Sequence, residues 1–303
     1  MATAPARRKV LIYACAVVPS FFWGFSFIWM KMAYQHYRPI TVVFIRLVLA
    51  AVFLSLFVAL SGKRQKLRPG DYKKFLLLSF FEPFCYFLGE SHGIRLVTPT
   101  TAAVIISTIP VVTPLLAYYF IRERLKAVNL AGMGLSFCGV LVMVGEGGLG
   151  GSLPGILLLF FAVASAVFYG VMLKKLSADY SPFVIVRNQN LIGAFLFLPL
   201  FLLLDWGHFA SVTPTRELML TILNLSLFAS TLAFLMITVA VRELGLSRTN
   251  IFGNLIPVVT AVFSYLMLGE QFGRQKLLGM ALALAGLFIS QLNPQGLFLR
   301  TEE

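Results

Sequence analysis

Carboxylates inside apolar stretches are the residues of this chain best placed to do chemistry. Glu82 and Glu90 lie in an apolar run over residues 74–93, together with His92. An ionisable side chain in hydrocarbon is costly, so it is by default a functional candidate. At about 1.5 Å per residue, Glu82 is expected about 12 Å in from Lys74, near the membrane midplane, with Glu90 and His92 nearer the outer face.

Glu82 has two functional interpretations and one structural alternative. It could carry a coupling proton, or it could pair as an anion with a cationic or amine-bearing substrate. Alternatively, it is a neutral side chain hydrogen-bonded to a neighbouring helix, or it is paired with Arg46. A functional role is favoured because Glu82 and Glu90 have no acidic counterpart in the second half of the chain, where Ala229 and Ile237 stand.

Polar, aromatic and proline residues extend this candidate site. Arg46 lies deep in its apolar run and either binds a substrate carboxylate or fixes helix packing; the packing role is slightly favoured. Proline frees a backbone carbonyl within a helix, which a cavity or a neighbouring helix must then satisfy. The candidate substrate-binding residues are Trp23, Arg46, Glu82, Tyr86, Ser107, Tyr169, Gln189, Asn250 and Asn254. The candidate coupling residues are Glu82 and Glu90, and the candidate hinges are Pro83, Pro110 and Pro257.

The composition places these residues in a membrane. Hydrophobic residues make up 59% of the 303 positions and charged residues 12%, against about 25% charge in a soluble domain. The net charge of +13 does not indicate nucleic-acid binding, because the basic residues cluster between apolar runs. About 20 apolar residues cross a bilayer. Ten such runs are expected, over residues 10–32, 40–61, 74–93, 99–121, 127–145, 153–173, 183–204, 217–240, 247–268 and 275–292.

Lysine and arginine set the expected orientation. They are concentrated in the segments that are cytoplasmic if the N-terminus is inside, notably around residues 7–9, 63–74 and 122–126. Positive residues favour the cytoplasmic side. We therefore predict a multi-pass protein of the cytoplasmic (inner) membrane of a prokaryote, with both termini cytoplasmic.

An internal repeat divides the chain into halves. Residues 109–141 align without gaps to residues 256–288, with the same residue at twelve positions. Each half would hold five helices, so the second half begins on the opposite side of the membrane and the repeats are inverted. Secondary transporters commonly have this architecture, with a site at the midplane between the repeats. The expected divisions are a cytoplasmic tail over 1–9, repeats over 10–146 and 153–292, and a cytoplasmic tail over 293–303.

With these features the chain resembles the drug/metabolite transporter superfamily, in its EamA-type branch. The resemblance is carried by Trp23-Gly24-Phe25-Ser26-Phe27, Phe44-Ile45-Arg46, the stretch 93–104, and the two ends that contain Glu123 and Glu270. It implies export of metabolites, and a central cavity lined by the first four helices of each half, with the fifth and tenth helices peripheral.

The predicted function is therefore secondary active transport, not catalysis. The leading hypothesis is export of a small metabolite, such as an amino acid or a related amphipathic compound, by alternating access. The alternative is a proton-coupled carrier of an amine or cation that uses Glu82. A remote alternative, an intramembrane lipid-modifying enzyme, would rest on Glu90 and His92. No catalytic residue, metal site or cofactor is expected. The expected partners are a small-molecule substrate, protons and membrane lipid, in a monomer or homodimer.

Overall fold

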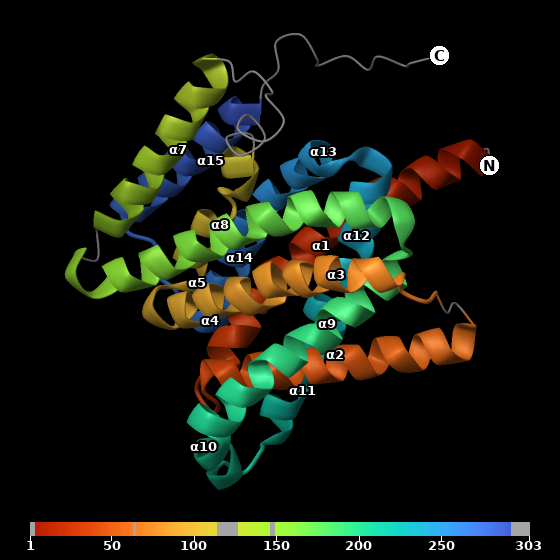
Figure 1. The fold of residues 1–303 in the computed structure, drawn as a ribbon. Helices are drawn as coiled ribbons and strands as arrows, with labels where there is room; N and C mark the ends of the chain where they lie inside the picture. The colour runs from red at the N-terminus through yellow and green to blue at the C-terminus, as the bar shows by residue number, and fades with distance from the viewer. Residues whose placement is uncertain (1–3, 63–64, 114–126, 146–148, 292–303) are drawn as a thin grey trace.

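The computed structural model describes residues 4–62, 65–113, 127–145 and 149–291, and throughout these residues every regular element is helical (Figure 1). The helices are α1 (Ala4–Ala33), α2 (Pro39–Ser61), α3 (Tyr72–Ser79), α4 (Tyr86–Leu96), α5 (Pro99–Ile106), α7 (Ala127–Gly145), α8 (Leu149–Asp179), α9 (Pro182–Leu200), α10 (Trp206–Ser211), α11 (Arg216–Asn224), α12 (Ala233–Leu244), α13 (Leu246–Asn250), α14 (Leu255–Leu268) and α15 (Arg274–Gln291). The chain is thus an all-α membrane protein.

Six helical stretches of the described chain are long and apolar enough to cross a membrane. They are Arg8–Ala33, Pro39–Ser61, Leu153–Asp179, Pro182–Ser211, Arg216–Leu244 and Ile251–Leu268, and shorter apolar helices cover Pro99–Thr113 and Leu130–Val142. The remaining two expected spans correspond to α3–α4 and to α15, and the count of ten stays a prediction. Large apolar side chains such as Leu60 and Leu203 are 88% and 81% exposed, as lipid-facing residues should be.

Two of the expected boundaries differ from the structure, and two lie outside the described residues. Helix α1 already begins at Ala4, and α8 begins at Leu149. The end of the fourth expected span, with Pro114 and Glu123, lies outside the described residues, as does the expected tail over 293–303.

The third expected helix is interrupted, so its predicted continuity over residues 74–93 is wrong. A π-helical segment, Phe80–Cys85, joins α3 to α4, and within it Glu82 has φ −145° and ψ 116°. These angles are extended, because the clash of a proline ring with the residue before it disfavours the helical conformation there. The angular spacing of Glu82 and Glu90 expected for a continuous helix therefore does not hold.

Two further helix breaks lie at nearly equivalent positions of the two repeats. Helix α5 ends at Ile106 and resumes at residue 109 after a turn, and a 3₁₀ segment, Ile251–Asn254, separates α13 from α14. Each break lies just before one of the expected hinge prolines, Pro110 and Pro257. In each repeat, the break leaves backbone N–H and C=O groups without helical partners within the fourth expected span.

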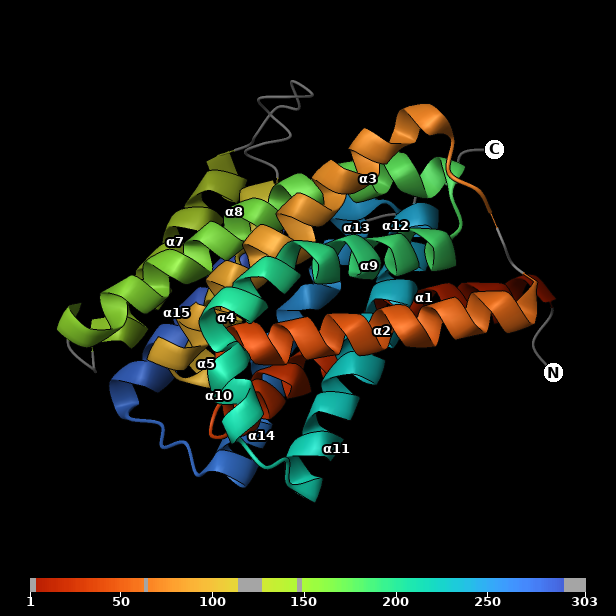
Figure 2. The same ribbon diagram turned by 60° about the horizontal axis from the view of Figure 1, so that its bottom comes forward.

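Helices α7 and α15 form a closely packed antiparallel pair beside the main body of the molecule (Figures 1 and 2). Their backbones approach at glycines: a Cβ added to Gly139 would lie 2.2 Å from the backbone nitrogen of Ala283, and one added to Gly286 would lie 2.3 Å from that of Ser136. Small residues allow this close approach of membrane helices.

The variant Gly139→Leu is expected to destabilise this pair. Its side chain has no space, and forcing atoms into a packed contact costs about 1–3 kcal/mol or more. A lower melting temperature in detergent, followed by size-exclusion chromatography of the heated protein, would show the effect. Gly134→Leu on the same helix is the control, because nothing lies within 4 Å of an added Cβ there. Equal melting temperatures for the two variants would contradict the prediction.

Helices α2 and α9 pack along one another. An aspartate lies near each end of α9: Asp205 just after it, and Asp71, which stands just before α3, beside the turn that precedes α9. Near the start of α2, Asp205 accepts hydrogen bonds from the backbone nitrogen (3.1 Å) and hydroxyl (2.9 Å) of Thr41. Near the start of α9, Asp71 accepts one from the Tyr180 hydroxyl (2.6 Å). Hydrogen bonds from Lys74 and Tyr180 hold the pKa of the Asp71 carboxyl below its ordinary value. We call these contacts the two aspartate clips.

Candidate functional site

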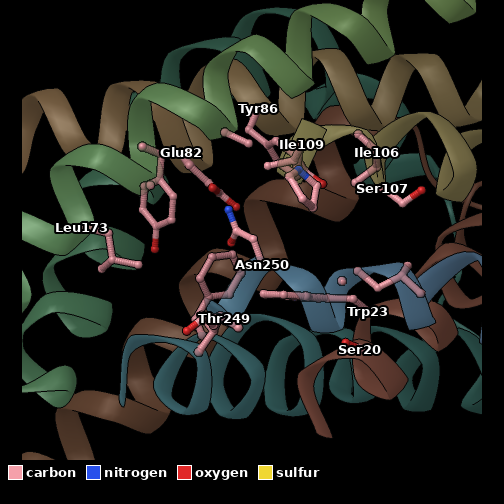
Figure 3. A pocket seen from close by; sticks show the side chains of 18 of the residues that line it. Ser20, Trp23, Glu82, Tyr86, Ile106, Ser107, Ile109, Leu173, Thr249 and Asn250 are labelled. Carbon is pink, nitrogen blue, oxygen red and sulfur yellow. The ribbon is translucent and has the colours of Figure 1, made fainter. Parts of the chain in front are cut away.

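A central cavity lies between the two halves of the chain, with a free volume of about 120 Å³, enough for several water molecules. Helices α1, α2, α4, α5, α8 and α12 to α14 contribute to its walls, and none of the described residues of α7 or α15 does. Of the predicted site residues, the cavity is lined by Trp23, Arg46, Glu82, Tyr86, Glu90, Ser107, Pro110, Tyr169 and Asn250. Figure 3 shows Trp23, Glu82, Tyr86, Ser107 and Asn250 among them.

Glu82 is held at the helix break, where its side chain enters the cavity (Figure 3). The residue is 7% exposed, and no side chain of the described residues forms an ion pair or hydrogen bond with its carboxyl group. Figure 3 shows the Asn250 amide pointing toward it from the opposite wall. Glu82 is thus a buried acid available to a ligand.

The Glu82–Pro83 turn packs directly on α9. A Cβ added to Gly193 would lie 2.2 Å from Cγ of Pro83 and 3.4 Å from Cδ1 of Leu47. A residue without a side chain is therefore needed at position 193 for the Glu82–Pro83 turn to pack against α9. Pro83 itself does not line the cavity, so its contribution is to position its neighbour.

Arg46 is engaged by the protein. It is 2% exposed; its Nε donates to the Ser230 hydroxyl (2.8 Å), its Nη1 lies 3.6 Å from the Met30 sulfur, and its guanidinium lies over the Phe87 ring, 4.3 Å from the centroid. No carboxylate of the described residues lies within ion-pair distance of Arg46, so the Glu82–Arg46 pair, one of the structural alternatives for Glu82, is not formed. These contacts are those of a packing residue.

Glu90 is deeper than its position in the sequence suggests. It is 4% exposed, lines the cavity and accepts a hydrogen bond from Tyr86 (2.7 Å). His92 does not line the cavity, and its Nδ1 lies 3.0 Å from the Leu88 carbonyl. The two residues that would have supported a lipid-modifying enzyme therefore do not share a site.

Aromatic rings form much of the remaining cavity wall. Trp23 donates from Nε1 to the Ala229 carbonyl (3.3 Å), and its ring meets Phe234 edge to face at 5.5 Å. Tyr169 donates to Gln189 (3.1 Å), which is 2% exposed and does not itself line the cavity. Gln189 thus orients a cavity residue.

At the two helix breaks, Ser107 and Asn250 line the cavity, whereas Asn254, which is 2% exposed, and Pro257 do not. Sequence reasoning missed several lining residues, among them Ser20 and Phe27. These two follow helical spacing from Trp23 on α1, so periodicity could have found them. Phe87 lies three residues before Glu90 on α4 and had the same signal, whereas Phe234 had none.

The cavity is longer toward one side of the membrane. Its lining continues to Leu173, Val241 and Leu246, near the ends of α8 and α12 on the side where α1 begins. Toward the other side it stops at Phe27, Arg46 and Glu90. Among the described His, Cys, Asp and Glu residues no group of three could hold a metal ion.

Comparison with known proteins places this geometry among transporters. A model of the EamA-like transporter family matches residues 10–145 and again residues 153–292. An uncharacterised transporter of Bacillus subtilis, YetK, is 27% identical over 249 residues, 80% of this chain and 75% of its own. One from Archaeoglobus fulgidus is 26% identical over 282 residues, 93% of this chain and 98% of its own. A crystal structure with 16% identity shares the fold, with a TM-score of 0.65, over 90% of this chain and 98% of its own.

Proposed function

The chain belongs to the EamA-like transporter family and is thus a membrane transporter of small molecules, and we propose that it exports a small amphipathic metabolite from the cytoplasm as a secondary active transporter. The observation that carries this proposal is the central cavity. It is walled by both halves of the chain, is longer toward one membrane face, and holds a buried acid that no described side chain pairs with. Alternating access requires a central site of this kind.

The walls of the cavity favour an amine over an amino acid as the substrate. Among the described lining residues Arg46 is the one cation, and Ser230, Met30 and Phe87 already contact its guanidinium. The carboxylate of an amino acid would therefore find no available positive partner. Glu82 and the rings of Trp23, Tyr86, Tyr169 and Phe234 offer what an organic cation requires, a carboxylate and aromatic faces.

Protons are the proposed coupling ion. A buried carboxyl that carries a proton in one step and an amine in the next would exchange the two across the membrane, because it cannot hold both. Glu90 lies on the same wall and shares the environment of Tyr86. It is the second proposed coupling group.

The test is a flux assay in proteoliposomes with a panel of amines, amino acids and neutral metabolites, with and without a pH gradient. Transport of amphipathic amines driven by the gradient is the expected result. If amino acids are transported and amines are not, the proposal that the substrate is an amine is wrong. No flux for any member of the panel, from protein shown to be folded, would argue against export of such metabolites.

The proposed location is the inner membrane of a prokaryote with both termini cytoplasmic, and it leads to a topology prediction. Reporter fusions after Arg68 and after Lys126 should be active as cytoplasmic fusions, and one near Gly150 as an external fusion, because basic residues favour the cytoplasmic side. Paired alkaline phosphatase and fluorescent protein fusions would measure this. A cytoplasmic result near Gly150 would contradict both the orientation and the span count.

A further inference from the structure

The membrane face opposite the start of α1 carries a buried ion pair between Lys276 and Glu270. The two side chains are 11% and 7% exposed. Glu270 Oε2 also accepts hydrogen bonds from the hydroxyls of Thr100 (2.9 Å) and Ser264, and Lys276 donates to the Thr98 hydroxyl (3.1 Å). We call these five residues the outer network.

The outer network joins three elements that are far apart in the sequence. Thr98 and Thr100 stand at the start of α5, Ser264 near the end of α14, and Lys276 in the first turn of α15. Gly269 has φ +66°, a conformation that favours glycine. It turns the chain so that the Glu270 backbone nitrogen returns to the Ser264 carbonyl (3.3 Å). Because the charges are largely removed from water, separating these elements would leave a buried charge without its partner.

The outer network lies beside a second hollow that is distinct from the cavity. Thr98, Ser264 and Glu270 line this hollow together with Lys31 and Arg95, and none of its described lining residues lines the central cavity. The layer of Phe27, Arg46 and Glu90 marks the end of the cavity on the same side. The substrate path is therefore closed on this face while the cavity extends toward the other.

The first repeat keeps the acid of this pair in its sequence, as Glu123, but not the lysine. The gap-free alignment that pairs residues 109–141 with 256–288 puts Asn129 at the position of Lys276, and the same offset puts Gly245 at the position of Thr98. Two repeats that exchange conformations would otherwise have gates of similar strength. A lysine that only the second repeat carries at this aligned position would favour the closed form of its own face over that of the other.

We propose that the Lys276–Glu270 pair is the latch of an outer gate, and that it makes the inward-open state the resting state of the transporter. This inference rests on the proposed alternating-access function, and it names the gate residues that favour one of the two states. Such a bias suits an exporter, because the empty site faces the compartment from which it loads. Substrate binding must then supply the free energy that separates α5 from α14 and α15.

Thiol labelling of the cavity from each side tests the latch without any substrate. A single cysteine, Ile106→Cys, reports on the cavity wall in a chain whose Cys15, Cys85 and Cys138 are replaced. In Lys276→Asn, which copies the first repeat, labelling by an impermeant reagent from the outer side should be about tenfold faster or more. Labelling from the inner side should be slower. Loss of a charge-assisted hydrogen bond shifts a two-state equilibrium by about that factor.

Two further variants and one control complete the experiment. Glu270→Gln keeps the hydrogen-bonding geometry and loses the charge, so it should shift labelling in the same direction even if Lys276→Asn folds poorly. Lys276→Arg keeps the pair and should label like the parent, as should Arg274→Asn on the exposed surface of the same turn. Unchanged labelling in folded Lys276→Asn and Glu270→Gln would overturn the latch. Absence of flux in the substrate panel with shifted labelling would instead count against the proposed export and leave the latch standing.

Discussion

Glu82→Gln is expected to abolish pH-driven amine transport and to weaken amine binding by about 10–100-fold at pH values where Glu82 is ionised in the parent, because a hydrogen bond to a charged partner contributes about 1.5–3 kcal/mol. The amide has nearly the same shape, so the protein should fold normally. Transport in proteoliposomes, divided by the amount of folded protein, and the shift in melting temperature on adding amine measure the two effects. Glu217→Gln, in the first turn of α11 and outside the cavity lining, is the matched control.

Each alternative role of Glu82 gives a different result. If Glu82 carries only the proton, the glutamine variant should lose pH-driven uptake and keep substrate exchange. If Glu82 is only structural, expression or thermal stability should fall while transport per folded molecule stays normal. That last outcome would defeat the proposal that this carboxyl group controls transport.

Gly193→Ala is expected to disable transport through a single added methyl group. The new Cβ would overlap the ring of Pro83, which lies 2.2 Å from that position, and the turn carrying Glu82 would have to move. Overpacking of this kind costs about 1–3 kcal/mol, and a displaced carboxyl group would no longer meet the substrate. Flux and melting temperature should therefore both fall.

A double variant separates displacement from general damage. Pro83→Ala removes the ring that the new methyl group meets, so Gly193→Ala combined with Pro83→Ala should regain part of the lost stability relative to Gly193→Ala alone. Gly207→Ala, where nothing lies within 4 Å of an added Cβ, is the control. Additive losses in the double variant would show that the contact between Pro83 and Gly193 does not position Glu82.

The fold class and several cavity residues could be predicted because they depend on local patterns. Apolar runs of membrane length identify helices in any context, and a buried acid beside a proline marks Glu82 without knowledge of its neighbours. The proline also suggested a flexible point, and the structure has a break there.

The partners of Arg46 show what sequence reasoning could not supply. Ser230 is 184 residues away in the chain, and only the packing of α2 against the π-helical segment Leu225–Leu232 brings the two together. Gln189 is a second example. Its polarity, visible in the sequence, led to the expectation that it contacts the substrate, whereas its hydrogen bond to Tyr169 depends on how α8 and α9 pack. Composition indicates which groups need partners, and tertiary contacts decide which partners they find.

The two aspartate clips have a consequence for how α9 can move. Asp205 joins the segment after α9 to the start of α2 at one membrane face, and Asp71, just before α3, joins the turn before α9 at the other. Helix α9 is thus fastened at both ends to the first half of the chain. A motion that carried α9 away from α2 and α3 would have to break hydrogen bonds to a carboxylate at both faces, and each such bond contributes about 1.5–3 kcal/mol. We therefore expect α2, α3 and α9 to move together.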